Sequence, residues 1–416
     1  MKARIKSIRF TRFQIWLFIL ASLMVAGVIA AFVVFTQGLI VTNLSDLVPW
    51  GLWITIDLSS IALSAGAFLL CAAVYLLGLK RFQPVARTAT FIGLIGYSMA
   101  VLTLLLDIGR PDRFWHALVF WNPHSVLWEV TMCVCLYLTV LAVEAAPIVG
   151  QAIWMQQRWP RLARRLESLH RFAPYLAVAG LLLSMLHQSS LGATFGVLKA
   201  RPIWYRPGLS VLFIISAAAG GISFTTLISM LTARLSNKAR VDDHLLERLA
   251  QIVGWILVGY LYFRFWDAFS MTYTYQPGRT EGLAVLTSGP LALNFWVGEI
   301  VVGALIPAVL LLNTRTRSKP TLRMLALGMV VIGLVAYRWD VTLAGQVVVM
   351  SYLPQSTATM YTHYFPSLIE ILTGAGVVAY GLMAITLGVR YFNIVEHEEP
   401  EHETNIDKAY AAASAD

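Results

Sequence analysis

Ten long apolar runs dominate the sequence and limit what the chain can fold into. They lie near residues 13–36, 52–79, 87–107, 126–148, 173–198, 209–233, 250–272, 290–313, 322–341 and 367–390. A helix of about 20 apolar residues crosses the hydrocarbon core of a bilayer, so each run is predicted to span a membrane. We therefore predict an all-α polytopic membrane protein with about ten transmembrane helices.

Composition excludes several other classes of protein. Hydrophobic residues make up 58% of the 416 residues and charged residues only 13%, which leaves no room for a large soluble domain. The formal net charge of +9 is dispersed between the apolar runs, which argues against nucleic acid as a partner. Cys71, Cys133 and Cys135 lie inside apolar runs without a CxxC pair, so no disulfide framework, zinc site or iron–sulfur cluster is expected.

The distribution of Lys and Arg predicts the orientation in the membrane. Counted over alternate sides of the runs, one side has 23 of these residues and the other has 6. Because positive residues collect on the cytoplasmic side, we predict that both termini are cytoplasmic. The first run follows five basic residues and has no small-residue cleavage site after it, so we expect an uncleaved first helix.

Ionisable residues within the runs are unevenly placed. All but Glu144 fall in the half that this orientation assigns to the outer side of the membrane, and charges at membrane depth usually have a function. This pattern predicts a polar cavity near the outer surface or a surface that receives an outer partner. The residues are Asp57, Asp107, Glu129, His187, Arg264, Asp267, Glu299, Arg338, Asp340 and Glu370.

Structural roles compete with functional ones for most of these residues. Arg264 and Asp267 are three apart on a helix and can neutralise each other. Arg338 and Asp340 are two apart, so they cannot share a face and at least one needs a partner on another helix. Asp57, Glu129 and Glu370 lie near the ends of their runs, where they can reach interfacial water.

Two polar segments are harder to explain as packing alone. His187 lies well inside its run and is followed by Gln188, Ser189 and Ser190, so one helical turn carries several hydrogen-bonding groups. The segment 104–129 joins two runs and combines acids, arginines, prolines and aromatic residues, with a carboxylate at the end of each run. The simpler interpretation of this segment is an interfacial loop whose Asp and Arg residues pair with one another.

Seven motifs combine aromatic, polar and charged residues at or near the ends of the runs. They are PWGLWITID (49–57), LLDIGRPDRFW (105–115), NPHSVLWE (122–129), LHQSSLG (186–192), RFWD (264–267), FWVGE (295–299) and YFPSLIE (364–370). Together they resemble the motifs of the NrfD-like, or polysulfide-reductase-type, integral membrane subunits. The resemblance covers nearly all ten runs and is strongest to the ten-helix branch, which includes the membrane subunits of the periplasmic uptake hydrogenase, of the Dsr complex of sulfur metabolism and of the menaquinone reductase complex.

The resemblance implies a fold and a set of partners. It implies two four-helix bundles, residues 37–200 and 201–345, with a peripheral helix at each end of the chain, in segments 1–36 and 346–392, and an acidic cytoplasmic tail, 393–416. It also implies a haem-free subunit in the bacterial inner membrane whose quinone pocket lies toward the periplasm. A periplasmic ferredoxin-like iron–sulfur subunit would dock above the pocket, alongside further periplasmic catalytic or cytochrome c subunits.

The same resemblance implies roles for individual residues. It gives quinone contact and proton handling to His187, Asp107 and Glu129, and it extends contact with the quinone to Arg338, Glu370, Asp57, Asp267 and Glu299. FWVGE departs from the FWxE spacing expected in the hydrogenase branch, because it has one more residue between Trp and Glu, and this changes the helical face expected for Glu299.

Quinone chemistry fits this set of residues. Reduction of a quinone takes two electrons and two protons, so its site needs a hydrogen-bond donor and a titratable relay. Only His187 lies deep in a run, so no opposed histidine pair for a b-type haem is expected, and the electrons would come from another subunit of an oxidoreductase complex. Glu144 could begin a proton route from the cytoplasm. A permease or ion exchanger, or a passive anchor without a quinone site, remains as an alternative.

Overall fold

The protein is described by a computed structural model that covers residues 11–235, 241–353, 356–392 and 394. The predicted basic N-terminal segment, up to residue 10, and the predicted acidic tail, from residue 395, lie outside the described residues. Ten helices in the described part are long and apolar enough to cross a membrane. They confirm the prediction of an all-α polytopic membrane protein.

The ten helices follow the ten apolar runs closely, and one of them is composed of two helical segments, η5 and α12. The bounds are α1 Arg12–Gln37, α2 Leu52–Tyr75, α3 Gln83–Asp107, α5 Val126–Gly150, α8 Ala173–Gly196, α9 Gly208–Leu235, α10 Asp243–Ser270, η5 Asn294–Leu305 with α12 Ile306–Leu312, α14 Pro320–Val347 and α15 Leu368–Tyr391. Local sequence fixes several of these starts. Ser125 caps α5 by accepting a hydrogen bond from the Trp128 N–H, and Pro320 opens α14 at a position where its missing N–H costs little.

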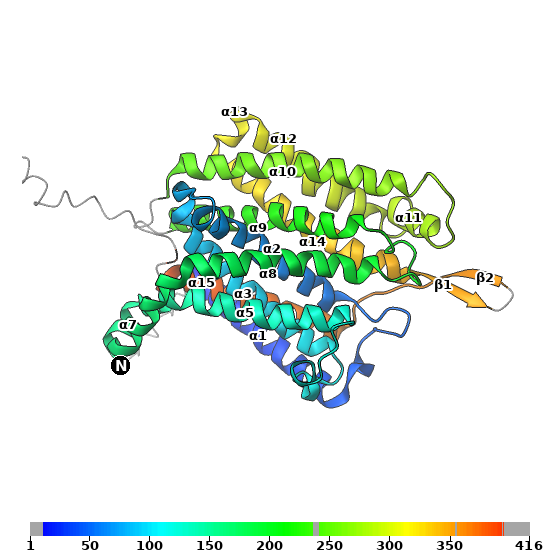
Figure 1. The fold of residues 1–416 in the computed structure, drawn as a ribbon, viewed down its shortest axis with the longest axis horizontal. Helices are drawn as coiled ribbons and strands as arrows, with labels where there is room; N and C mark the ends of the chain where they lie inside the picture. Colours follow the sequence, from blue (N-terminus) through cyan, green and yellow to red (C-terminus); the bar gives the residue numbers. More distant parts are fainter. Residues whose placement is uncertain (1–10, 236–240, 354–355, 393, 395–416) are drawn as a thin grey trace, which may run out of the picture.

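Short elements connect the spans. They are η1 Leu39–Val41, η2 Lys80–Phe82, η3 Pro111–Arg113, α4 His116–Val119, α6 Ile153–Arg158, α7 Pro160–Ser168, η4 Leu169–Phe172, α11 Arg279–Thr287, α13 Thr314–Arg317 and the strands β1 Val348–Leu353 and β2 Ser356–Tyr361. The connections 38–51, 108–125, 197–207, 271–293 and 348–367 all lie at one end of the helices, which we call the long-loop end (Figure 1). It is the end that the charge distribution assigns to the outside.

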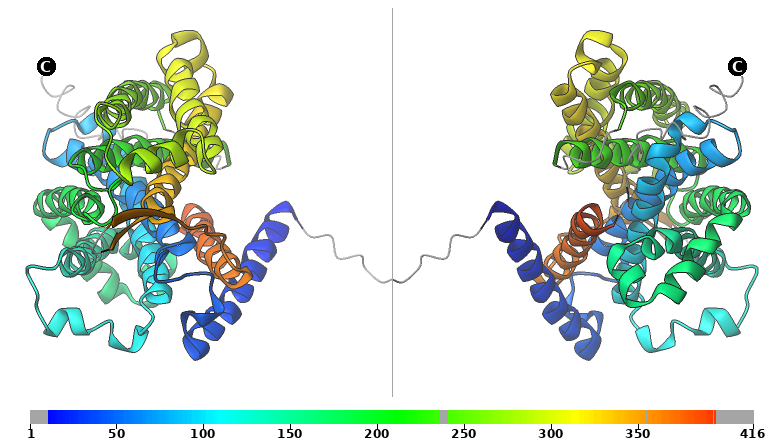
Figure 2. Two further views of the ribbon diagram at one scale, coloured as in Figure 1. Left: turned by 90° about the vertical axis from the view of Figure 1, so that its right-hand side faces the viewer. Right: turned by 90° about the vertical axis from the view of Figure 1, so that its left-hand side faces the viewer.

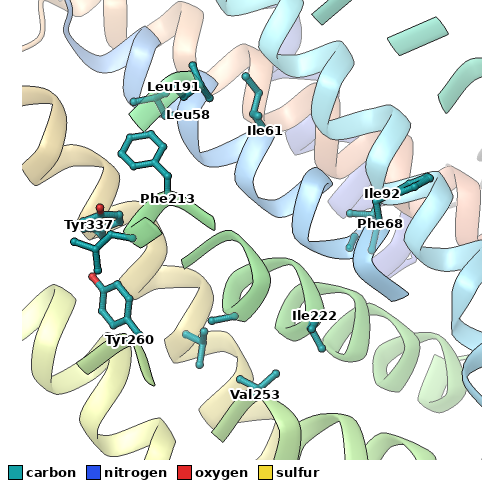
Figure 3. Packing of buried hydrophobic residues seen from close by; sticks show 14 of the residues in the cluster. Leu58, Ile61, Phe68, Ile92, Leu191, Phe213, Ile222, Val253, Tyr260 and Tyr337 are labelled. Carbon is teal, nitrogen blue, oxygen red and sulfur yellow. The ribbon is translucent and has the colours of Figure 1, made fainter. Parts of the chain in front are cut away.

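Helices α2 and α9 form the centre of the protein. Helix α2 packs on α3, α8 and α9, and α9 also contacts α8, α10 and α14. Small residues allow the close crossing, since a side chain at Gly66 would run into the backbone of Ala217 and Gly221. The buried apolar cluster therefore continues from the helices of the first half of the chain into those of the second, as Figure 3 shows for residues from Phe68 to Tyr260.

Helices α1 and α15 pack on each other at the edge of the helical array (Figure 2). Gly27 and Gly376 allow this contact, because a Cβ added to Gly27 would lie 2.7 Å from the Cα of Gly376. The first and last spans are thus side by side, although more than 300 residues separate them. The division of the remaining spans into two four-helix bundles stays a prediction.

The β1–β2 hairpin was not expected from the sequence. Its two strands pair antiparallel, with Val348 opposite Tyr361 and Met350 opposite Thr359. It projects from the long-loop end in line with the helices (Figure 1). The rest of the described chain agrees with the all-helical prediction.

Candidate functional site

A cavity of about 420 Å³ lies at the long-loop end of the first half of the chain. Helices α2, α3, α5 and α8 surround it, together with the connection that contains α4. Leu58 of α2 and Leu191 of α8 lie side by side at its wall (Figure 3). The volume is within the range of about 300–1,000 Å³ that is common for small-molecule sites.

The walls of this cavity are mostly apolar, with few polar groups. The lining residues are Trp50, Ile54, Asp57, Leu58, Val101, Leu104, Leu105, Asp107, Ile108, Phe114, Leu118, Leu127, Val130, Thr131, Val134, Cys135, Leu191, Thr194 and Phe195. An apolar pocket with a small number of polar groups suits a flat, largely apolar molecule that carries a few hydrogen-bonding atoms.

Asp57 and Asp107 are the two carboxylates at the cavity. Asp57 lies one and a half turns into α2 and Asp107 is the last residue of α3, so consecutive antiparallel helices bring them to the same wall. Each has a buried Oδ1 with no hydrogen-bond partner among the described residues. Asp57 is also within range of electrostatic repulsion by Asp107. Asp57 is buried and Asp107 is partly buried, and neither has a cationic partner among the described residues. Such acids are costly, which is typical of a site that handles protons or a polar ligand.

The arginines of the 104–129 segment do not neutralise Asp107. Arg110 instead pairs with Asp112, with both of its hydrogen bonds at 3.2 Å, and this pair is exposed. The simpler interpretation of the segment, that its Asp and Arg residues pair, is therefore confirmed for Asp112 but not for Asp107. Phe114 and Leu118 of the same segment cover the cavity.

His187 lies behind the cavity wall, outside the set of lining residues. It is fully buried, and its Nδ1 is 2.8 Å from the hydroxyl of Tyr97 on α3. Its Nε2 has no partner in the described part of the chain. Leu191, one turn later on α8, does line the cavity, so the histidine is one helical turn deeper in the membrane than the site.

Glu129 is also beside the cavity without lining it. The Ser190 hydroxyl donates a hydrogen bond of 2.7 Å to its Oε1, which joins the start of α5 to α8. Leu127 and Val130, its neighbours in sequence, face the cavity. Ser190 belongs to the polar turn after His187 that the sequence identified, so this turn bonds to an acid on a neighbouring helix.

Glu370 is held by several hydrogen bonds from the protein. Its carboxylate accepts bonds from the Asn43 N–H at 2.9 Å, from the Ser367 N–H at 2.8 Å and from the Tyr364 hydroxyl. Tyr364 in turn accepts a bond of 2.9 Å from the Leu52 N–H, the first residue of α2. Glu370 therefore connects the starts of α15 and α2 and helps to position the helix that carries Asp57.

Arg338 is buried where α8, α9 and α14 meet. Its Nη2 donates to the Gln188 side chain, to the Phe213 carbonyl and to the Ser216 hydroxyl, each at 3.2 Å, and its guanidinium lies 3.8 Å from the Phe213 ring centroid. It forms no ion pair within the described ranges. Asp340 points to a different partner, the Asn294 amide at 2.8 Å, as expected for residues two apart on a helix.

Arg264, Asp267 and Glu299 form a buried ion-pair network in the second half. Arg264 pairs with Asp267 at 2.8 Å, which confirms the pairing predicted from their spacing, and with Glu299 at 2.6 Å. Arg206 also pairs with Asp267 at 2.7 Å, and Tyr260 donates to Glu299 at 2.7 Å. Both acids therefore have cationic partners, unlike Asp57 and Asp107.

Glu299 lies in a π-helix, η5, and this geometry bears on its unusual motif spacing. A π-helix has more residues in each turn than an α-helix, so it absorbs extra residues in a motif. Although FWVGE has the additional residue, the Glu299 side chain still points to Arg264 and Tyr260 of α10.

The two halves of the chain share one hydrogen-bonding arrangement, in which a tryptophan at the start of a span bonds to the short helix that precedes it. In the first half, Trp128 at the start of α5 donates its indole N–H to the Ala117 carbonyl of the short helix α4. In the second half, Trp296 near the start of η5 donates to the Thr287 carbonyl at the end of the short helix α11. Asp107 and Asp267 lie near the end of the preceding helix in each case. Asp107 and Asp267 thus occupy corresponding places in the chain, and among the described residues only Asp267 has arginine partners.

Two further cavities were compared with the cavity of Asp57 and Asp107. One of about 400 Å³ lies between α10, α11 and η5 and is lined by Phe265, Phe269, Phe295 and Arg264 among other residues. Another of about 220 Å³ lies at the opposite, short-loop end and is lined by Glu144, with Thr90 donating to that carboxylate at 3.3 Å. The first has no unpaired acid at its wall, and the second is remote from the long-loop end.

Sequence reasoning missed several residues of the site. Trp50, Leu191 and Cys135 line the cavity, and Tyr97 is the hydrogen-bond partner of His187. Tyr97 was detectable in principle, since it is a polar aromatic residue in the middle of an apolar run. The other three are ordinary apolar positions whose role depends on the arrangement of helices in space.

Comparison with known proteins identifies the family of this chain. Residues 40–350 match the family model described as polysulphide reductase, NrfD. The chain belongs to the NrfD family. The NrfD match spans both the cavity and the ion-pair network of the second half.

Three relatives of this NrfD chain indicate the range of complexes in which the family occurs. The chain is 31% identical over 399 residues to the menaquinone reductase integral membrane subunit of Nitratidesulfovibrio vulgaris, covering 93% of both proteins. It is 25% identical to a probable Ni/Fe-hydrogenase 2 b-type cytochrome subunit of Escherichia coli, covering 88% and 89%. It is 24% identical to an Hdr-like menaquinol oxidoreductase integral membrane subunit of Archaeoglobus fulgidus, covering 92% and 94%.

Proposed function

We propose that this chain is the quinone-binding membrane subunit of a respiratory oxidoreductase complex, with its quinone site in the cavity that holds Asp57 and Asp107. The observation that carries the proposal is a pair of carboxylates in an apolar pocket, each with a buried oxygen that has no partner among the described residues. The names of two relatives, a menaquinone reductase subunit and a menaquinol oxidoreductase subunit, support menaquinone as the ligand. Membership of the NrfD family argues against the permease alternative.

The residues of the cavity can supply what quinone reduction requires. One quinone takes up two electrons and two protons to become a quinol, and the reverse reaction releases them. Asp57 and Asp107 lie at the wall, where protonated carboxyl groups donate hydrogen bonds to the quinone oxygens and pass on protons. The apolar walls hold the ring and keep bulk water away from it.

Tyr97 and His187 act as a relay behind the acids in this proposal. Their hydrogen bond of 2.8 Å is buried between α3 and α8. These two helices also carry the cavity residues Asp107 and Leu191. We place His187 in proton handling and not in direct contact with the quinone, because the residues of α8 that line the cavity are Leu191, Thr194 and Phe195. Glu129, bonded to Ser190, supports the same wall.

Four other residues were predicted to contact the quinone, and the geometry gives this role less support for each of them. They are Asp267, Glu299, Glu370 and Arg338. Asp267 and Glu299 are paired with arginines, and Glu370 is engaged by bonds from the protein. Arg338 lies between the halves and bonds to Gln188, the neighbour of His187. We propose that Arg338 stabilises negative charge that develops during reduction, and that the other three residues position helices.

Electrons reach the site from another subunit in this proposal, and protons come from the opposite side of the membrane. We propose a periplasmic iron–sulfur subunit as the electron partner, in the bacterial inner membrane, with further catalytic or cytochrome c subunits beyond it. The haem-free character of the chain stays a prediction. Glu144 and its cavity at the short-loop end are the proposed proton entrance, which would make turnover electrogenic.

A pair of tryptophan variants tests the quinone site. Leu191→Trp fills the cavity beside Asp57, whereas Leu261→Trp fills the comparable cavity of the second half. We expect Leu191→Trp to weaken binding of a menaquinone analogue, followed by fluorescence quenching, by at least about tenfold, or about 1.4 kcal/mol. Leu261→Trp should bind as the wild type does. Equal elution volumes and unfolding temperatures establish that both variants fold, and normal binding by Leu191→Trp would refute the assignment.

Orientation is tested separately by labelling with a membrane-impermeant maleimide on intact cells. Asp112→Cys places a thiol at the long-loop end and Arg161→Cys places one in α7 at the other end. Label at position 112 alone supports a periplasmic site, and label at position 161 alone would reverse the orientation.

A further inference from the structure

The β1–β2 hairpin leaves the helices at the end where the cavity lies, and it carries an unusual surface. The whole connection 348–367 contains no Asp, Glu, Lys or Arg. The strands β1 and β2 within it nevertheless project away from the helical array in line with the helix axes (Figure 1). A two-stranded hairpin alone is marginally stable in water and has open edges, so native proteins usually cover or charge such an element.

Large apolar and aromatic side chains lie exposed on and beside this hairpin. Tyr361 is 65% exposed and Met360 is 44% exposed on β2, while Tyr273 and Tyr275 are 65% and 69% exposed on the connection after α10. A hydrogen bond to Glu281 raises the pKa of Tyr275, and the nearby Tyr361 adds to this effect, which places the two rings on one surface. We call Tyr273, Tyr275, Met360 and Tyr361 the hairpin platform. Tyrosine and methionine are enriched in the core of protein–protein interfaces.

The base of the hairpin is rigidly attached to the cavity. Gln346, just before β1, accepts a hydrogen bond of 3.0 Å from the Trp50 N–H and donates one of 2.7 Å to the Trp50 carbonyl. Arg201 donates to the Gln346 carbonyl at 3.2 Å, and the Thr362 hydroxyl after β2 donates to the same carbonyl at 2.9 Å. Since Trp50 lines the cavity, a protein held on the platform would be fixed relative to the proposed quinone site.

We infer that the hairpin platform is the docking surface for the redox subunit that exchanges electrons with the quinone. The inference rests on the proposed function, because only a quinone site in this cavity requires an electron carrier at the long-loop end. Two electrons pass between the docked subunit and the quinone, while the two protons pass through the membrane chain. The surface of the partner that meets the platform is expected to be apolar and able to cover the open edge of β2.

Site-specific crosslinking in native membranes tests the platform directly. A photoreactive benzoyl-phenylalanine replaces Tyr361, and a control carries it in place of Tyr391, which is also exposed but lies at the C-terminal end of α15. We expect position 361 alone to crosslink to a co-purifying protein that carries iron–sulfur or haem centres, shown by its absorption spectrum and mass spectrum. Crosslinks from position 361 only to lipid, only to a second copy of this chain, or to no protein would overturn the inference.

A charge-insertion variant separates docking from quinone binding. Met360→Lys combined with Tyr361→Lys should lower the amount of redox subunit per membrane chain at least tenfold in the purified complex, and Tyr361→Phe should leave it unchanged. Binding of the menaquinone analogue to the membrane chain should be the same in all three proteins. Full retention of the redox subunit in the lysine variant would refute docking and leave the quinone proposal standing. If the lysine variant loses the redox subunit and neither the wild type nor any variant binds the menaquinone analogue, the docking surface is supported and the proposed function is refuted.

Discussion

Asp57 and Asp107 face one cavity from consecutive helices, and each keeps a buried carboxylate oxygen without a hydrogen-bond partner among the residues that the structure describes. The corresponding part of the second half has Asp267 and Glu299, and both are paired with Arg264. Paired acids are poor proton donors, whereas unpaired acids in an apolar pocket can exchange protons with a ligand. The difference between the halves explains why we assign the chemistry to the first.

Replacement of Asp57 or Asp107 by Asn tests this assignment. Each change keeps the shape of the side chain and removes a titratable group, so we expect quinone reduction by the intact complex to slow on the order of 10²-fold, as for loss of a general acid. Binding of the menaquinone analogue should change much less. Stopped-flow measurement of quinol formation gives the rate, and Asp112→Asn, at an exposed pair, is the matched control. Wild-type rates in both cavity variants would contradict the account.

His187→Ala should affect stability and proton transfer more than binding. The change leaves the buried Tyr97 hydroxyl without its 2.8 Å partner, which costs about 1–3 kcal/mol. We expect a lower unfolding temperature, slower turnover and a quinone-analogue affinity within about tenfold of the wild type, since the histidine does not line the cavity. Tyr97→Phe removes the same hydrogen bond from the other side and should resemble it. Lost binding in a folded His187→Ala protein would instead put His187 in contact with the quinone.

Arg264→Met should destabilise the second half strongly. It leaves Asp267 and Glu299 buried with fewer cationic partners, and removal of one member of a buried ion pair costs about 3–5 kcal/mol. Adding Glu299→Gln to the same chain should recover part of this loss. Thermal unfolding in detergent measures both, and Arg110→Met, which breaks an exposed pair, should leave the unfolding temperature unchanged. An unaltered unfolding temperature for Arg264→Met would show that the network contributes little.

Glu144→Gln should separate electron transfer from charge movement. If protons enter at the cavity of the short-loop end, turnover in sealed vesicles should slow, and the membrane potential formed for each quinol should fall. A potential-sensitive dye reports the potential, and quinol absorbance reports turnover. Glu167→Gln, at the edge of the same cavity, is the control. Unchanged potential and rate in Glu144→Gln would place proton uptake elsewhere.

The sequence predicted the helices well because each span is encoded locally. A run of apolar residues must form a helix in lipid, where no water satisfies the backbone. The Arg264–Asp267 pair was predictable for the same reason, since residues three apart share a helical face. The link from Arg264 to Glu299 joins α10 and η5, and no spacing along the chain reveals it.

The residue types at the cavity were predictable from the sequence, but the way in which the helices bring them together was not. Asp57 and Asp107 were recognised as two of the ionisable residues at membrane depth, whereas the cavity between them depends on apolar residues such as Leu191 and Val134 that resemble any other position in a span. His187 was expected at the site and lies one turn deeper, because a one-turn difference along a helix depends on how α8 packs on α3. The hairpin was missed because 348–361 lies between two spans, and the pattern of apolar runs that predicts spans carries no information on strand pairing within a connection.

Photoaffinity labelling tests the central claim most directly, because two cavities of nearly equal size compete for the quinone. An azido-menaquinone analogue is activated by light on the intact complex, with and without excess unmodified menaquinone, and the labelled peptides are sequenced by mass spectrometry. The account predicts label that menaquinone suppresses within residues 101–108, 127–135 or 191–195, at the cavity of Asp57 and Asp107. Suppressible label found only within residues 261–300, at the cavity beside Arg264, would contradict it.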